Sequence, residues 1–213
     1  MKHYMPLAVL ALLAVVAAQA GATNLLQNGS FQTGDFTDWT LGTTPNGTAG
    51  QGFPIVTPWP LNNSINAWEG EVGQINFVQN DFEGATLSQN FSTAGGAAVL
   101  SFSLLAMGGG FDNDDGGDFR MLLDGATVAG FDVGSIQANQ MISGTLSANV
   151  NLTPGTHSFE IDVLRPFEAN GTPFQYVTNI DVEGNPVPEP GSLVLMGSGV
   201  LGLAGVLRRR IGL

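Results

Sequence analysis

Cysteine is absent from this sequence of 213 residues, and basic side chains are scarce. Without cysteine the chain has no disulfide, no thiolate metal ligand and no thiol nucleophile. Lys2 and the arginines at 208–210 lie near the two ends, so residues 21–188 contain only Arg120 and Arg165. Against them stand 17 acidic residues, the chain's 18 less one in the C-terminal tail, for a net charge near −15. This balance excludes nucleic acid and anionic membrane surfaces as partners, and leaves neutral sugars and divalent cations.

The N-terminus has the three parts of a secretory signal peptide. A short basic start is followed by an apolar run at 7–18, and Ala18-Gln19-Ala20 gives a small-x-small cleavage site. Cleavage after Ala22 fits the same pattern. The apolar run is shorter than the roughly 20 residues of a comfortable membrane span. The sequence therefore predicts export and removal of residues 1–22 by signal peptidase.

The C-terminus combines a rigid motif, an apolar segment and a basic cluster. Val187-Pro188-Glu189-Pro190 precedes an apolar run at 192–207, which Arg208, Arg209 and Arg210 follow. As a helix the run would reach about 24 Å, slightly short of the ~30 Å hydrocarbon core, and the arginines would stay on its cytoplasmic side. The two prolines hold the motif extended just outside the membrane, where a processing enzyme could reach it.

These three parts in this order resemble the PEP-CTERM tail of exosortase substrates. The resemblance implies a sorting tail at 186–213 that an exosortase recognises and removes. It also implies transient anchoring in the bacterial inner membrane, followed by transfer to the cell surface or to extracellular polysaccharide. An ordinary C-terminal membrane anchor is the alternative.

Between residues 24 and 185 no sustained helical period occurs, and short alternating segments recur between turns. Asp124-Gly125 between two such segments indicates a hairpin, and Pro154-Gly155 indicates another turn. This pattern predicts an all-β fold, an antiparallel jelly-roll sandwich of eight to ten strands at 23–185. The segments expected as strands are 86–91, 99–104, 119–123, 126–128, 145–152, 157–164 and 174–182.

The stretch from Asn28 to Trp39, NGSFQTGDFTDW, resembles the opening motif of exported jelly-roll domains, among them galactose-binding-like carbohydrate-binding modules. The resemblance implies a structural calcium ion between this motif and the last strand, at Gln32 and Asp181. Gln32 departs from the glutamate usual in the family, and a neutral amide is a weaker ligand.

A second candidate for calcium comes from the residues themselves. Asp112, Asp114, Asp115 and Asp118 place four carboxylates within seven residues, and a hard cation would relieve their repulsion. The spacing does not fit an EF-hand, because a glycine occupies the fifth position. The alternative is a hydrated loop between two strands.

Aromatic and acidic residues provide the candidates for ligand binding. Trp59, between two prolines, is expected to present its ring to solvent, whereas Trp39 is expected in the core and Trp68 half-buried on a strand. Glu69 and Glu71 would share a strand face about 6.5 Å apart, near the separation of glycosidase carboxylates, although neighbouring glycines favour a loop. His157 has no nucleophile motif near it and is expected at a strand end, bonded to backbone.

The sequence therefore predicts a non-enzymatic surface or matrix protein, with polysaccharide binding as a candidate activity. Two other classes stay open: a structural or adhesive matrix protein that binds no sugar, and a glycan-active hydrolase.

Overall fold

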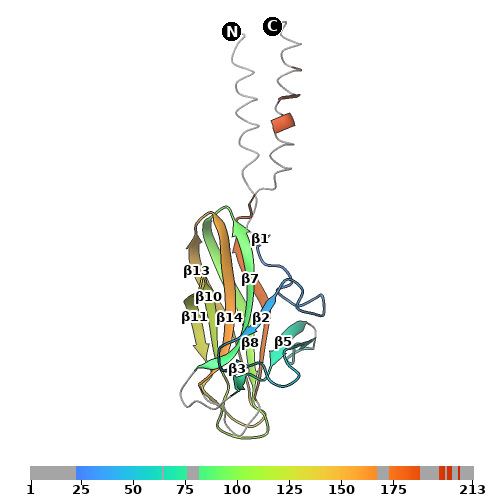
Figure 1. The fold of residues 1–213 in the computed structure, drawn as a ribbon. Helices are drawn as coiled ribbons and strands as arrows, with labels where there is room; N and C mark the ends of the chain where they lie inside the picture. The colour runs from blue at the N-terminus through green and yellow to red at the C-terminus, as the bar shows by residue number, and fades with distance from the viewer. Residues whose placement is uncertain are drawn as a thin grey trace.

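Two antiparallel sheets pack face to face in the computed structural model (Figure 1). The structure describes residues 23–63, 65–75, 82–166, 173–187, 197–199, 201–202 and 206. The predicted signal peptide at 1–22 lies outside these residues, as do Pro188 to Pro190 and the three C-terminal arginines. Among the residues described, no helix is long and apolar enough to cross a membrane.

The first sheet has six strands and the second has five. In order, the first contains β13 (Met141–Leu152), β8 (Gly96–Met107), β15 (Phe174–Gly184), β5 (Asn66–Gly70) and β4 (Ile55–Pro58), with β1 (Thr23–Asn24) paired to β15. The second contains β11 (Ala126–Asp132), β10 (Asp118–Leu123), β14 (Gly155–Arg165), β7 (Glu83–Thr93) and β2 (Thr40–Thr43). Two short ladders pair β12 (Ser135–Ile136) with β9 (Asp114–Asp115), and β3 (Gly47–Thr48) with β6 (Gly73–Gln74).

The strand order confirms the predicted jelly roll. The chain alternates between the sheets, so that β5, β15, β8 and β13 face β7, β14, β10 and β11. Eight strands in two such four-stranded arrays form a jelly roll. The two main sheets contain more strands than the eight to ten predicted, because β1, β2 and β4 extend them at the edges.

Period-two alternation builds the core, as the sequence predicts. On β8, Leu100, Phe102 and Leu104 are fully buried between the sheets, and the serines between them face outward. On β14, Phe159 and Ile161 meet them from the other sheet. Burying each such side chain contributes about 1.5–3 kcal/mol, which makes this alternation the main source of stability.

The two predicted turns also occur. Asp124 and Gly125 join β10 to β11 with positive φ angles of 52° and 77°, as a two-residue hairpin loop of this type requires. Thr153 and Pro154 join β13 to β14. These two turns and the turn at Ala94–Gly95 lie at the same end of the sandwich, because β7, β10 and β13 all run toward it.

Candidate functional site

The opening motif forms a loop that lies against a break in strand β15. Between Thr178 and Asp181 the pairing of β15 with β8 shifts register, so Asn179 and Ile180 leave the ladder. The freed Ile180 N–H donates to the carbonyl of Gly29 at 2.9 Å. A β-bulge of this kind redirects the neighbouring side chains, here those of Asn179 and Asp181, toward the loop.

Gly29 is required by this close approach. A Cβ atom at this position would lie 2.0 Å from the Ile180 carbonyl oxygen, far inside any real contact. The backbone nearby is also strained, since Asn28, Phe31 and Asn179 have φ angles of 51°, 52° and 50°. Such conformations in residues other than glycine persist only where surrounding contacts hold them, and they cluster at functional sites.

Side chains of the motif hold the loop in place. Asn28 donates to the carbonyls of Asp35 and Thr37 at 3.1 and 3.0 Å, and its carbonyl accepts from the Trp39 indole at 3.1 Å. Phe31 is fully buried beside Trp39, which confirms that Trp39 belongs to the core. Asn28, Phe31 and Trp39 of the motif therefore have a structural role, which is to fix the loop over β15.

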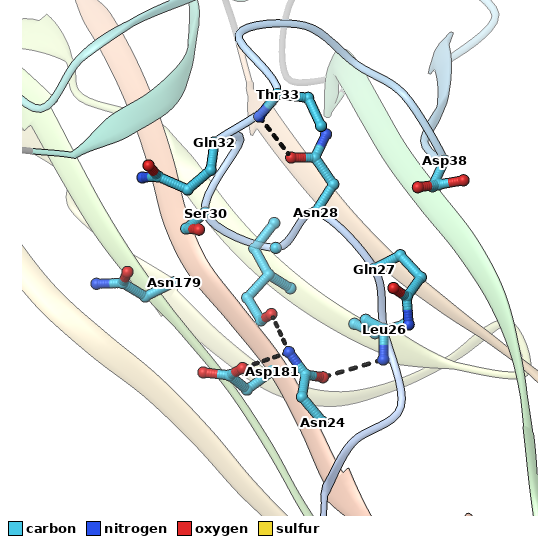
Figure 2. Close-up of a pocket in the computed structure, with 12 residues that line it drawn as sticks. Asn24, Leu26, Gln27, Asn28, Ser30, Gln32, Thr33, Asp38, Asn179 and Asp181 are labelled. Atoms are coloured by element: carbon cyan, nitrogen blue, oxygen red, sulfur yellow. Dashed lines mark hydrogen bonds between the residues drawn. The ribbon is translucent and has the colours of Figure 1, made fainter.

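Loop and bulge together line an open pocket of about 540 Å³ (Figure 2). Its polar lining consists of Asn24, Gln27, Asn28, Ser30, Gln32, Thr33, Asp38, Asn179 and Asp181. The pocket thus brings together Gln32 and Asp181, which the sequence paired as calcium ligands. Amides and hydroxyls predominate over the two carboxylates, and the described lining contains neither a basic nor an aromatic side chain.

Asn24 organises the floor of this pocket. Its Oδ1 accepts from the backbone N–H groups of Leu26 and Val182, both at 3.0 Å. Its Nδ2 donates to Asp181 Oδ1 and to the Ile180 carbonyl (Figure 2). Burial raises the pKa of Asp181, as does the neighbouring Glu183, and the bond from Asn24 opposes them. One Asp181 oxygen is therefore already hydrogen-bonded, while the side chain lines the cavity.

The donor set suits a neutral polar ligand better than a bare cation. Calcium takes six to eight oxygens, commonly with several carboxylates. Only Asp38 and Asp181 carry charge in the pocket, and the described residues contain no group of three or more His, Asp or Glu side chains that could hold a metal. A calcium ion here would depend on Asp181, Gln32 and neutral oxygens, so the calcium hypothesis at this position stays a prediction.

The four aspartates of the acidic loop have separate surroundings. Asp112 accepts from the Ala138 N–H, Asp115 from the Gly117 N–H, and Asp118 forms an ion pair with Arg120 at 2.7 Å. Asp114 is 2% exposed, and its Oδ2 has no hydrogen-bond partner among the described residues. Calcium at this loop also stays a prediction, one for which the structure shows no converging carboxylates.

The expectation of an exposed Trp59 ring is wrong. Trp59 is only 6% exposed, because the chain between β4 and β5 folds back and lays the indole edge-on against Tyr176 on the outer face of the first sheet. Trp68 is 2% exposed and lies between the sheets, more deeply than the half-buried position predicted. Neither ring can stack on a sugar without rearrangement.

The paired glutamates do not share a strand. Strand β5 ends at Gly70, so Glu69 is on the strand and accepts from the Tyr176 hydroxyl at 3.2 Å, whereas Glu71 follows it. Tyr176 itself has its pKa raised well above the ordinary value by burial and by Glu69. The 6.5 Å separation predicted for two carboxylates on one strand face does not apply.

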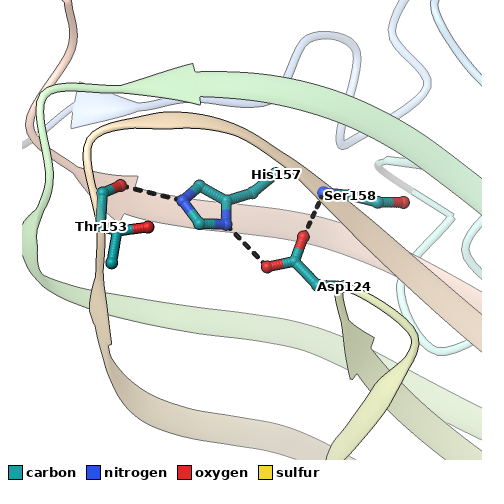
Figure 3. A network of polar contacts seen from close by, with 4 residues as sticks. All are labelled: Asp124, Thr153, His157 and Ser158. Carbon is teal, nitrogen blue, oxygen red and sulfur yellow. Dashed lines mark hydrogen bonds and ion pairs between the residues drawn. The ribbon is translucent and has the colours of Figure 1, made fainter.

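His157 lies near the start of β14 and bonds through both ring nitrogens, which confirms the expected backbone bond (Figure 3). Nδ1 is 2.7 Å from Asp124 Oδ2, and Nε2 is 2.9 Å from the Thr153 carbonyl. Because an ionised carboxylate and a carbonyl only accept, both bonds exist together only in the doubly protonated ring. The Thr153 carbonyl and Asp124 accordingly raise the pKa of His157, and the same contact lowers the pKa of Asp124.

A further acidic pair that sequence reasoning missed lies on the outer face of the second sheet. Burial, and then the hydrogen bond and charge of Glu160, raise the pKa of Asp162 to about 7, while Arg120 opposes them. The two carboxyls are two residues apart on β14, and Asp162 pairs with Arg120 across the sheet. The two-residue spacing was visible in the sequence, but the partial burial of Asp162 was not.

Together these features define a class: an antiparallel jelly-roll sandwich with a polar pocket, rich in amides and hydroxyls, between its opening motif and its last strand. The PEP-CTERM protein-sorting motif matches residues 186–210. The chain therefore carries this sorting motif immediately after the jelly roll. No curated protein matches the chain.

Solved structures with similarity to this chain include carbohydrate-binding domains. The module TmCBM61, solved with β-1,4-galactotriose, is 12% identical, with 75% of this chain and 97% of that chain covered and a TM-score of 0.45. The CBM36-1 domain of a multidomain xylanase from the hindgut metagenome of Trinervitermes trinervoides is 20% identical, covering 70% and 99% with a TM-score of 0.33. The jelly-roll assignment itself rests on the strand order.

Proposed function

We propose that this chain is an exported cell-surface or extracellular-matrix protein that an exosortase processes at its C-terminal motif. Its jelly-roll domain binds a neutral polysaccharide in the opening-motif pocket and catalyses no reaction. The sorting motif at 186–210 supports the route of export. The observation that carries the binding role is the pocket lining of amides and hydroxyls.

The size and charge of the pocket favour sugar over other ligands. About 540 Å³ lies within the range of small-molecule sites and accommodates one or two sugar rings. Amide and hydroxyl groups both donate and accept, which matches the alternating donors and acceptors of sugar hydroxyls. The net charge near −15 of residues 21–188 repels anionic polymers, so the ligand is a neutral polysaccharide.

Retention of the processed protein on neutral and acidic polysaccharides tests the binding role. Asn179→Ala and Gln32→Ala remove pocket amides, whereas Asn149→Ala removes an exposed amide on β13, outside the pocket. Loss of one or two hydrogen bonds should weaken binding about tenfold in each pocket variant. Asn149→Ala should bind like the unaltered protein.

Two results would contradict this assignment. If Asn149→Ala weakened polysaccharide binding as much as the pocket variants do, the pocket would not be the binding site. No retention on any neutral polymer would leave the structural or adhesive role.

A further inference from the structure

The two described ends of the jelly roll lie side by side. Thr23 pairs with Gly184 and Asn24 with Glu183 in the ladder between β1 and β15, at the end where the turns 94–95, 124–125 and 153–154 lie (Figure 1). The segments that precede and follow the domain therefore leave from the same end.

The fold continues into the sorting motif itself. The Asn185 carbonyl accepts from the Ala94 N–H at 3.0 Å and from Thr93 Oγ1 at 2.7 Å, and the Asn185 amide donates to the Gly95 carbonyl at 3.1 Å. Pro186, the first residue of the motif, forms a bridge with Thr93. The turn from β7 to β8 thus holds the chain up to Pro186.

Only Val187 separates this anchored point from Pro188. Two extended residues span at most about 7 Å, which is short against a sandwich whose strands are about 35 Å long. An enzyme that takes the Pro188–Pro190 segment into a cleft must therefore meet the end of the folded domain.

Charge is distributed unevenly along the same axis. Near this end lie Glu183 and Asp124, the latter in contact with His157 at 2.7 Å. The opposite end, by the register of the strands and the loops between them, carries the larger set of carboxylates: Glu69, Glu71, Glu83, Asp112, Asp114, Asp115, Asp118 and Asp132. At about 35 Å these charges are several Debye lengths away, so they exert little repulsion on a membrane-side partner.

We infer that the end face formed by Ala94–Gly95, Asp124–Gly125, Thr153–Pro154 and Asn185–Val187 is a contact surface for the membrane-bound processing enzyme. This inference rests on the proposed exosortase processing. The turns, in which the Asp124 carboxylate is paired with His157, meet the enzyme at the membrane surface, and the carboxylate-rich end points away from it. The domain is thereby presented in one orientation when its tail is removed.

Charge introduced into the end face tests this contact. Ala94 and Thr153 are both exposed, so Ala94→Glu/Thr153→Glu adds two carboxylates to the face without altering the core. Ala94→Gln/Thr153→Gln controls for side-chain size, and Ser143→Glu/Thr145→Glu adds the same charge at exposed positions of β13. Full-length chains are expressed with the exosortase, and the rate of tail removal is followed by immunoblot and mass spectrometry.

The Glu pair in the end face should slow tail removal about tenfold, while both controls are processed at the unaltered rate. A ten-residue Gly-Ser spacer between Val187 and Pro188 should restore the rate of the Glu pair, because the domain no longer has to approach the enzyme. Unaltered processing of the Glu pair, or slow processing that the spacer does not relieve, would overturn the inference. An unaltered chain that keeps its tail in the presence of exosortase would overturn the proposed processing as well. Equal melting temperatures of the variants exclude misfolding as the cause.

Discussion

Replacing Gly29 with alanine examines the close approach on which the pocket depends. The added Cβ would lie 2.0 Å from the Ile180 oxygen, so the loop must move by roughly 1.5 Å to restore van der Waals contact. That movement breaks the 2.9 Å bond from Ile180 N–H to the Gly29 carbonyl. One lost hydrogen bond together with an unsatisfied buried N–H costs about 2–4 kcal/mol.

Thermal denaturation of the processed protein measures this cost. For a domain of this size, 2–4 kcal/mol lowers the melting temperature by roughly 10 °C. Gly110→Ala is the matched control, because no atom lies within 4 Å of its added Cβ and its stability should change by less than about 0.5 kcal/mol. Gly29→Ala should also lose polysaccharide retention, since the pocket wall moves. If Gly29→Ala had the same melting temperature as Gly110→Ala, the close approach of Gly29 to the bulge would be refuted, together with the pocket that it shapes.

Three other predictions concern protons and calcium. Because the pKa of His157 is raised in the folded protein, the stability that the protonated ring contributes is complete below about pH 6.5 and is lost as the pH rises through its pKa in the folded state. Because the pKa of Asp124 is lowered, the stability that its carboxylate contributes is lost as the pH falls below about 4. His157→Gln should therefore flatten urea-denaturation stability measured between pH 5 and 9; an unchanged profile would show that the ring is not held as the cation. Asp162 changes stability in the direction opposite to Asp124. Its proton is held more tightly in the folded state, so ionisation of Asp162 destabilises the fold as the pH rises toward 7. Asp162→Asn should gain about 2 kcal/mol at pH 8, after discounting for partial exposure, and nothing at pH 4; equal gains at both would contradict the shift. If calcium binds at Gln32 and Asp181, a hundredfold excess over its Kd should stabilise the domain by about 2.7 kcal/mol, and Asp181→Asn should abolish the effect. A melting temperature that changes with neither calcium nor chelator would contradict the calcium hypothesis for both this pocket and the acidic loop.

Local pattern predicted the strands and turns because those features depend on neighbouring residues. Alternation along β8 and β14 marks which side chains face the core, and Asp124-Gly125 specifies a tight hairpin by backbone preference alone. The bulge in β15 also left a signal: Val177 and Ile180 both face inward three residues apart, which breaks the period of two. That break could have located the site.

The position of Trp59 could not be predicted in the same way. Its burial depends on Leu105 and Tyr176, which lie far along the chain and face outward from the first sheet. Only the tertiary arrangement shows that a second small apolar cluster covers this outer face. The two flanking prolines indicated an exposed loop, but long-range packing determines the burial of Trp59.

The pocket likewise depends on residues distant in sequence. Gln32 and Asp181 were paired by family resemblance, and the structure places both in one cavity. The contribution of Asn24 had no signal in the sequence, because three of its four side-chain bonds, those to Ile180, Asp181 and Val182, form only when β1 lies against β15.

The mass of the surface-exposed protein, isolated from its host, tests the central claim most directly. Removal of both ends predicts a chain that begins at Gly21 or Thr23 and lacks Arg208, Arg209 and Arg210. Either start keeps β1 paired with β15, so the processed domain remains folded. A surface-exposed chain that still ends in Leu213 would contradict processing at the sorting motif.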